Sequence, residues 1–236
     1  MRDYTEITDR LIKLHLPQEL IGTVYDYPIY KLYLQSTIKT QNHVLLTSGL
    51  HGDEPGGIEA SLQFLSRDNS DLLKLFNFTV IPCINPYGYV HNTRENRDGV
   101  DINRMFESNE IKEVMIIKEC LGETQFSFTI DFHEDYDATG FYMYEGQEDN
   151  KFIGPDIAQQ VTTIGPMDTE DSGEDTTPIV KGVYNVSPKW GAKGLAPYML
   201  HHHTKHVLIT ETPTDWQIEQ RAALHLGLLD AALEYY

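Results

Sequence analysis

The sequence predicts a single α/β domain with a mixed, largely parallel central sheet and helices on both faces. Short apolar runs alternate with helical patterns along most of the 236 residues, which is typical of parallel strands covered by helices. This length is enough for one substantial hydrophobic core. No internal repeat or linker-like stretch divides the chain, so we expect one domain over residues 1–236.

In the first half of the chain, the spacing of apolar residues separates helices from strands. Ile7, Leu11 and Leu14 lie four and three residues apart, which predicts a helix over residues 4–15. Pro55 suits the first turn of a second helix, which continues through residues 58–67. Apolar runs or alternation predict strands at residues 23–36, where one or two strands surround Pro28, and at residues 43–50 and 78–85.

A long polar excursion over residues 85–106 leads into the second half of the chain. Ser108 and Asn109 are candidate caps for a helix that runs to residue 121. The same patterns predict two more strands and three more helices. These strands cover residues 126–132 and 207–210, the helices cover residues 156–164, 195–205 and 216–236, and residues 167–178 are expected to form an acidic surface loop.

The charge and the cysteines narrow the class of protein. The chain carries 36 acidic and 18 basic residues, a formal net charge of -18. This field repels nucleic acid and anionic membranes, although it can also reflect solubility alone. Cys83 and Cys120 are too few for a disulfide framework. With no signal-peptide pattern and no stretch long enough to span a bilayer, we expect a cytoplasmic protein without nucleic-acid or membrane partners.

Side chains of the kind that bind metals follow three of the expected strands. His51 and Glu54 follow residues 43–50, His133 follows residues 126–132, and Glu211 follows residues 207–210. The carboxyl ends of parallel strands meet at one edge of a sheet, where ligands bind. Zinc takes imidazole and carboxylate ligands, and a catalytic site keeps three of them. His51, Glu54 and His133 could therefore hold one Zn²⁺, and Glu211 could deprotonate a water bound to it.

Each of these residues also has a structural interpretation. His51 could cap or pack, Glu54 could favour a helix N-terminus, and Glu211 could be a surface acid. The hypothesis depends on several of them following strands of one sheet, because neither an HExxH nor a GxSxG motif is present. Glu134 and Asp135 could support a second metal or raise the basicity of the site, but we expect them to face solvent.

Two further groups of residues have alternative interpretations. Arg94, Arg97 and Arg104 in the polar excursion suit a substrate carboxylate through bidentate pairing, or they pair with the protein's own acids. In the run HHHTKH, His202 and His206 are four residues apart in an expected helix. They could ligate a metal, but packing or surface positions are the expected role.

Four segments, in this order, resemble the zinc metallocarboxypeptidase superfamily, the M14 peptidases. They are GLHGDEPGG (49–57), NPYGYVHNTRENRDGVDINRMF (85–106), DFHED (131–135) and ITETP (209–213), and they span most of the chain. The superfamily also includes the succinylglutamate desuccinylase and aspartoacylase branch. The resemblance implies a hydrolase of amide bonds that uses one zinc ion per chain.

The resemblance also implies a role for each matching residue around the metal. His51, Glu54 and His133 match the zinc ligands, and Glu211 matches the general base that activates the zinc-bound water. Asp101 matches an acid that holds a ligand histidine in the required tautomer.

Other matching residues would contact the substrate. Arg94, which fits the pattern better than Arg97, matches the residue that polarises the scissile carbonyl. Asn103 and Arg104 match the pair that grips a substrate carboxylate. A mobile tyrosine usually precedes the base in this superfamily; Tyr184 and Tyr198 both precede Glu211 but lack convincing flanking residues.

Three functions follow as expectations. The first is a metallocarboxypeptidase that releases C-terminal residues from peptides, including cell-wall peptides, and NPYGY and ITETP favour it. The second is a deacylase of N-acyl amino acids, which the short chain favours slightly. Both act on substrates with a free carboxylate. The third is a metal-binding regulatory module without turnover.

Overall fold

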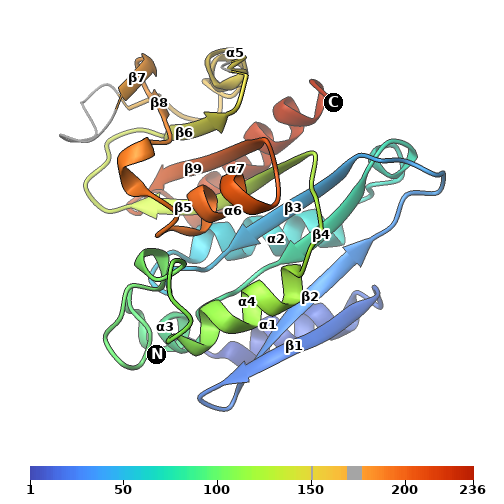
Figure 1. Ribbon diagram of the computed structural model, residues 1–236, viewed down its shortest axis with the longest axis vertical. Coiled ribbons are helices and arrows are strands. Elements are labelled where there is room, and N and C mark those ends of the chain that lie inside the picture. Colours follow the sequence, from blue (N-terminus) through green and yellow to red (C-terminus); the bar gives the residue numbers. More distant parts are fainter. Residues whose placement is uncertain (150, 169–176) are drawn as a thin grey trace.

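The computed structural model describes residues 1–149, 151–168 and 177–236, and the strands of this part form one nine-stranded sheet (Figure 1). Its order is β1-β2-β4-β3-β5-β9-β6-β8-β7. The strands are β1 (Gln18–Val24), β2 (Tyr27–Leu34), β3 (His43–Ser48), β4 (Asn77–Ile81), β5 (Phe128–Asp135), β6 (Tyr142–Gln147), β7 (Thr177–Val180), β8 (Val183–Asn185) and β9 (His206–Pro213).

The centre of the sheet is parallel and its margins are mixed. Strands β4, β3, β5 and β9 run parallel to one another. On one side β2 and then β1 add antiparallel strands. On the other side β6 pairs antiparallel with β9, β8 joins β6 in parallel, and β7 pairs antiparallel with β8. The predicted fold class is therefore confirmed.

Helices cover both faces of this sheet. The helices are α1 (Tyr4–Lys13), α2 (Pro55–Ser66), α3 (Pro86–His91), α4 (Lys112–Leu121), α5 (Gly154–Gln160), α6 (Leu195–His202) and α7 (Ile218–Leu233), with short 3-10 turns at Leu72–Lys74, Ile102–Arg104 and Pro188–Trp190. Helices α2 and α7 lie on one face, and α4 and α6 lie on the other (Figure 1). None of the described helices has the length and apolar character needed to cross a bilayer.

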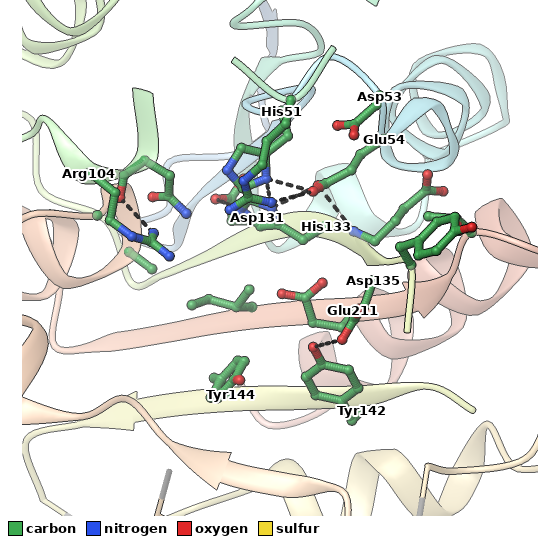
Figure 2. Close-up of a pocket in the computed structure, with 18 of the residues that line it drawn as sticks. His51, Asp53, Glu54, Arg104, Asp131, His133, Asp135, Tyr142, Tyr144 and Glu211 are labelled. Carbon is green, nitrogen blue, oxygen red and sulfur yellow. Dashed lines mark hydrogen bonds and ion pairs between the residues drawn. The ribbon is translucent and has the colours of Figure 1, made fainter. Parts of the chain in front are cut away.

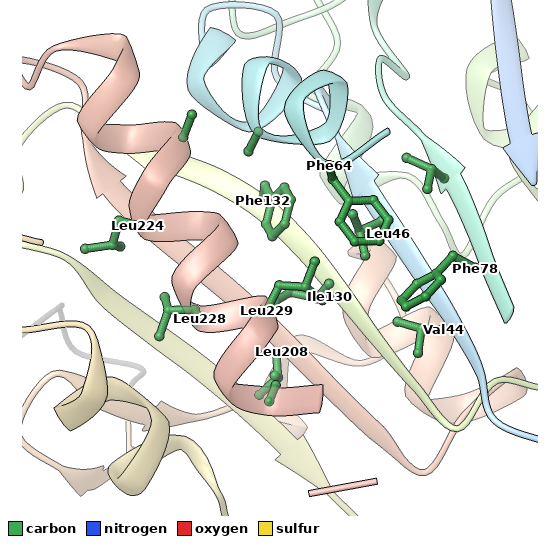
Figure 3. Packing of buried hydrophobic residues seen from close by; sticks show 14 of the residues in the cluster. Val44, Leu46, Phe64, Phe78, Ile130, Phe132, Leu208, Leu224, Leu228 and Leu229 are labelled. Atoms are coloured by element: carbon green, nitrogen blue, oxygen red, sulfur yellow. The ribbon is translucent and has the colours of Figure 1, made fainter. Parts of the chain in front are cut away.

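The larger core lies between the sheet and helices α2 and α7. Phe64 of α2 and Leu228 of α7 pack with Val44, Ile130 and Phe132 of strands β3 and β5 (Figure 3). Full burial of such a side chain contributes roughly 1.5–3 kcal/mol. This packing fixes strand β5, whose carboxyl end carries part of the candidate site.

Alternation along β5 decides which side chains reach the opposite face. Phe128, Ile130 and Phe132 belong to the core under α2 and α7. Because successive side chains of a strand point to opposite faces, Asp131 and His133 point toward the face that carries α4 and α6. We call these two faces the α2/α7 face and the α4/α6 face.

Most of the predicted elements are present, with differences at their ends. Two strands, β1 and β2, cover the region around Pro28, and Pro28 lies within β2. The predicted caps of α4 are wrong: the helix begins at Lys112, and its N-cap position is Ile111, which has no side-chain cap. Ser108 instead accepts a hydrogen bond from the backbone of Glu110, which forms a turn before the helix.

Several elements were not expected from the sequence. The strands β6, β7 and β8 and the helix α3 lie in regions read as polar or irregular. Strand β6 contains glutamate, glycine and glutamine after its tyrosines, so its apolar signal is short. Its burial comes from neighbours that are distant in sequence, β9 and β8. Of the expected acidic loop, residues 169–176 lie outside the described part of the chain.

Candidate active site

One row of side chains crosses three strands on the α4/α6 face. His133 of β5 is paired in register with Glu211 of β9, and Glu211 is paired with Tyr142 of β6. Residues opposite each other in neighbouring strands project to the same side. This row forms the floor of a cavity of about 1060 Å³, which is also lined by His51, Glu54 and residues from the segments 92–104 and 189–197.

The loop after β3 places two of the predicted metal ligands beside this row. His51 and Glu54 are buried, and so is His133 (Figure 2). Nδ1 of His51 lies 2.6 Å from Oε1 of Glu54, and Nδ1 of His133 lies 2.9 Å from Oε2 of the same carboxylate. Possible ligand atoms of the three residues all lie within 4.8 Å of one another. They form a candidate metal site.

The outer nitrogens of both imidazoles face carboxylates. Nε2 of His51 lies 3.2 Å from Oδ1 of Asp101, and Nε2 of His133 lies 2.8 Å from Oδ2 of Asp131. A proton on each Nε2 satisfies these carboxylates, and it leaves the lone pair of each Nδ1 directed at Glu54. In this buried site, two imidazole lone pairs and one carboxylate face one another. Such a set of donor atoms fits Zn²⁺.

The charges around Glu54 and His133 shift the pKa values of these two residues in opposite directions. Burial disfavours the ionised form of Glu54, but the two neighbouring imidazoles hold the pKa of its carboxyl far below the usual range. Burial likewise opposes protonation of His133, but the carboxylates of Asp131 and Glu54 raise its pKa well above the usual value. The site therefore concentrates negative charge that favours a cation at its centre.

Asp131 was not identified from the sequence. It accepts a hydrogen bond from Thr47 of β3 at 2.7 Å and contacts His133 with its other oxygen. Thr47 and Asp131 lie on adjacent parallel strands and are paired in register. The spacing of two residues between Asp131 and His133 within a strand was the available signal, because it places both side chains on one face. Asp101, in contrast, contacts His51 as the resemblance implied.

The carboxylate of Glu211 is directed into the cavity across from the three donors (Figure 2). It forms no side-chain hydrogen bond within the described part of the chain, so it can accept a proton from a molecule in the cavity. Burial raises the pKa of Glu211 above the usual range, the charge of His133 opposes this rise, and the carboxylates of Glu54 and Asp135 add to it. A raised pKa suits a group that takes up and releases a proton near neutral pH.

The tyrosines of the cavity differ from the two candidates in the sequence. Tyr142 and Tyr144 of β6 line it, and the hydroxyl of Tyr142 donates a hydrogen bond to Asp135 at 2.6 Å. Tyr184 is buried next to Tyr144, and Tyr198 packs on Phe106; neither lines the cavity. Tyr142 was missed because the strand that carries it was missed.

The acids that follow His133 do not lie as expected. The side chain of Glu134 is fully buried and forms an ion pair with Arg221 at 2.9 Å, so the expectation that it faces solvent is wrong. Alternation along β5 turns it toward the α2/α7 face. Burial raises the pKa of Glu134, and the guanidinium of Arg221 opposes this rise by stabilising the ionised carboxylate. Asp135 is half-buried and lines the cavity.

The arginines of the polar excursion separate into two groups. Arg94 lines the cavity, and its guanidinium donates to Asp101 at 3.1 Å and lies 3.5 Å from Glu54. Arg97 instead lies over the ring of Tyr25, at 5.3 Å from the centroid, and does not line the cavity. Of the two candidates for the carbonyl-polarising residue, only Arg94 is therefore near the candidate metal site.

Asn103 and Arg104 also line the cavity. The side-chain oxygen of Asn103 accepts a hydrogen bond from the backbone of Leu195, at the start of α6. This contact ties the polar excursion to α6 and fixes that wall of the cavity. Arg104 donates to the backbone oxygen of Asn103, and within the described residues it has no carboxylate partner. Its positive charge remains available to a ligand.

The histidines near residue 202 do not form a metal pair. Helix α6 ends at His202, and His206 is the first residue of β9, so they do not share a helix face. His202 is exposed, whereas His206 is buried and contacts Glu145 at 2.8 Å. Within the described residues, only His51, Glu54 and His133 form a group that could hold a metal ion.

Comparison with known proteins connects this geometry to one group of enzymes. The family model of the succinylglutamate desuccinylase/aspartoacylase catalytic domain matches residues 40–151, which include His51, Glu54 and His133. A search of the curated proteins gives no match.

Similar solved structures share the fold at low sequence identity. A candidate metallopeptidase from Shewanella amazonensis is 21% identical with a TM-score of 0.82, over 98% of this chain and 91% of that one. Carboxypeptidase A from Helicoverpa armigera is 16% identical with a TM-score of 0.77, over 99% of this chain and 73% of that one. A metallo-carboxypeptidase from Pseudomonas aeruginosa, in complex with (2-guanidinoethylmercapto)succinic acid, is 14% identical with a TM-score of 0.69, over 98% and 67%. The family match over residues 40–151 and the shared fold both support the resemblance to the metallocarboxypeptidase superfamily, the M14 group that includes the succinylglutamate desuccinylase and aspartoacylase branch.

Proposed function

We propose that the protein is a zinc-dependent hydrolase of amide bonds, and that it acts as a metallocarboxypeptidase on the C-terminal residues of peptides, including cell-wall peptides. The observation that carries this proposal is the arrangement of Glu211 across the cavity from His51, Glu54 and His133. Two imidazoles and one carboxylate would hold the ion, and the second carboxylate, that of Glu211, which has no hydrogen-bond partner among the described residues, is the candidate base.

In this mechanism each residue acts on a stated atom. A bound zinc ion would supply Lewis-acid polarisation of the scissile carbonyl and would acidify water. The carboxylate of Glu211 takes a proton from the attacking water and later gives it to the leaving amine. The guanidinium of Arg94 faces the negative charge that develops on the carbonyl oxygen. Asp101 and Asp131 hold the ligand imidazoles in the tautomer that presents Nδ1.

The substrate that fits this cavity best is a peptide with a free C-terminal carboxylate. Arg104, which forms no ion pair within the described residues, supplies a positive charge for that carboxylate, and Asn103 lies beside it. A volume of about 1060 Å³ is at the upper end of the range for small-molecule sites. That volume leaves room for residues on both sides of a scissile bond, and it favours a peptide over a small N-acyl amino acid.

A deacylase of N-acyl amino acids is the second candidate, because the matching family model describes the succinylglutamate desuccinylase/aspartoacylase catalytic domain. A substrate panel separates the two functions. It contains free peptides, the same peptides with amidated C-termini, and N-acetyl and N-succinyl amino acids. Cleavage of the free peptides and not of the amidated ones supports the carboxypeptidase. Hydrolysis of the N-acyl amino acids alone supports the deacylase.

The Glu211→Gln variant tests the mechanism itself. We expect it to bind one zinc ion per chain, because Glu211 is not a ligand, and to lose at least about 10²–10⁴-fold in turnover. Zinc content measured by elemental analysis, beside the rate on the best substrate, checks both expectations. A fully active variant contradicts the role of Glu211. A different result favours a regulatory metal-binding module: the wild-type protein binds stoichiometric zinc but hydrolyses no amide on the panel.

We also propose a cytoplasmic location, without nucleic-acid or membrane partners. Two unpaired cysteines, Cys83 and Cys120, support a reducing compartment. The net charge of -18 supports the absence of polyanionic partners.

A further inference from the structure

The buried ion pair between Glu134 and Arg221 adjoins the candidate metal site but is not part of the ligand set. The backbone N–H of Glu134 donates to Oε2 of Glu54 at 3.1 Å. Its side chain turns to the α2/α7 face, where Oε1 accepts the backbone N–H of Gly56 at 2.9 Å. Glu134 therefore contacts Glu54 directly, and it also contacts the first turn of the helix that follows Glu54.

The first turn of α2 fits closely around this carboxylate. A Cβ atom on Gly56 would lie 2.0 Å from Oε1 of Glu134 and 2.9 Å from Cβ of Arg221. A Cβ atom on Gly57 would lie 2.8 Å from the backbone oxygen of Phe132. The two glycines of the DEPGG segment thus allow α2 to approach β5 directly. This approach brings the N-cap position of α2, Glu54, to the carboxyl end of β5.

Arg221 of α7 compensates the charge of Glu134. Its Nη1 atom lies 2.9 Å from both oxygens of that carboxylate, whose side chain is fully buried. Without this guanidinium, a buried carboxylate would stand uncompensated beside Glu54, and breaking such a pair from one side is strongly unfavourable. The arrangement makes the place of Glu54 depend on residues from α2, β5 and α7.

We propose that Glu134 and Arg221 form a positioning pair that fixes the Glu54 carboxylate in the geometry needed to bind the metal ion. The inference rests on the proposed function, because it requires that Glu54 is a metal ligand. Neither residue is proposed to touch the metal or the substrate. Residues that orient metal ligands in this indirect way typically change metal affinity about 10–100-fold when mutated.

A second ion pair in the protein provides a matched control. Arg67, at the C-cap of α2, forms an ion pair with Asp230 of α7 at 2.5 Å, at the opposite end of the same helix pair. Like Glu134→Gln, Asp230→Asn replaces one carboxylate of an ion pair that involves α7 by an amide and changes few other atoms. If the Glu134–Arg221 pair only joined the layers of the fold, the two variants would affect metal binding alike.

The experiment measures the affinity of the full-length chain for Zn²⁺ by competition with a chromophoric chelator, beside the free energy of unfolding of the metal-free protein. The variants are Glu134→Gln, Arg221→Met, Arg221→Lys and Asp230→Asn. We expect zinc affinity to fall about tenfold or more in Glu134→Gln and Arg221→Met. We expect Arg221→Lys, which keeps the charge, to recover part of the loss, and Asp230→Asn to match wild type.

The possible outcomes separate this inference from the proposed function. Equal zinc affinity in wild type, Glu134→Gln and Arg221→Met would overturn the positioning role and leave the metal site intact. A wild-type protein that binds no zinc would overturn both. If Glu134→Gln does not fold, Gly56→Ala displaces the Glu134 carboxylate without changing any charge, and unchanged zinc affinity in that variant would also refute the inference.

Discussion

The buried imidazole of His225 predicts a specific loss of stability in mild acid. His225 lies on α7 and is fully buried, with its two nitrogens 2.7 Å and 3.3 Å from the hydroxyls of Thr210 and Thr212 on β9. Its ring stacks on Phe132 at 4.8 Å between centroids. Burial, with a further contribution from the charge of His133, lowers the pKa of His225 from 6.5 to about 3.

The sign and size of the effect follow from this difference in pKa. Between pH 6.5 and about 3 the unfolded chain binds a proton at His225 and the folded chain does not, so acid favours the unfolded state. The neutral imidazole of His225 makes its full contribution to the free energy of unfolding above pH 6.5. Below that pH, this contribution falls by up to about 1.4 kcal/mol for each pH unit. Between pH 7.5 and pH 5 the loss from this one residue amounts to roughly 2 kcal/mol.

Urea unfolding of wild type and His225→Gln at pH 7.5, 6.5, 5.5 and 5 measures this effect, with a metal chelator present throughout. The variant lacks the titrating ring, and we expect it to be less stable at pH 7.5 because it loses the contact with Phe132. We also expect the stability difference between the two proteins to shrink by about 2 kcal/mol as the pH falls to 5. A constant difference across this range would refute the assignment of a buried neutral imidazole.

Two further predictions concern the candidate active site. Asp131→Asn weakens the hydrogen-bond acceptor that holds His133, so we expect zinc affinity to fall about 10–100-fold while the fold is kept. Chelator competition measures the affinity, and circular dichroism checks the fold. Unchanged affinity would contradict the role of Asp131. Arg104→Gln removes a positive charge that lines the cavity. We therefore expect kcat/KM on free peptides to fall about 10–100-fold, the equivalent of roughly 1.5–3 kcal/mol for a charged hydrogen bond. A variant that still distinguishes free from amidated peptides as wild type does would show that another residue binds the carboxylate.

The parts of the fold that the sequence predicted are those with strong local signals. The strand around Leu46 is an apolar run, the strand around Ile130 alternates apolar and polar residues, and the helices beside them have clear apolar spacing. His51, Glu54 and Glu211 follow such runs at short distances, so the carboxyl edge of the sheet could be inferred as their meeting place. The roles of these residues remain predictions that the variants above test.

What could not be predicted depends on strand ends and on distant partners. The reading of β5 ended at Phe132, whereas the strand continues to Asp135. With that longer strand, alternation would have placed Glu134 on the α2/α7 face. Its partner Arg221 lies 87 residues away along the chain, and no local pattern connects the two. Tyr142 reaches the cavity only because β6 pairs with β9, a contact that joins segments far apart in sequence.

The position of β9 has a consequence for how the site is assembled. This strand is the last of the nine strands that the structure describes, yet it lies between β5 and β6 near the middle of the sheet. During synthesis from the N-terminus, the ribosome releases His51, Glu54 and His133 long before Glu211. With the proposed roles, a nascent chain holds all three candidate ligands while it still lacks the candidate base, so the proposed hydrolysis requires the final strand to enter the gap between β5 and β6.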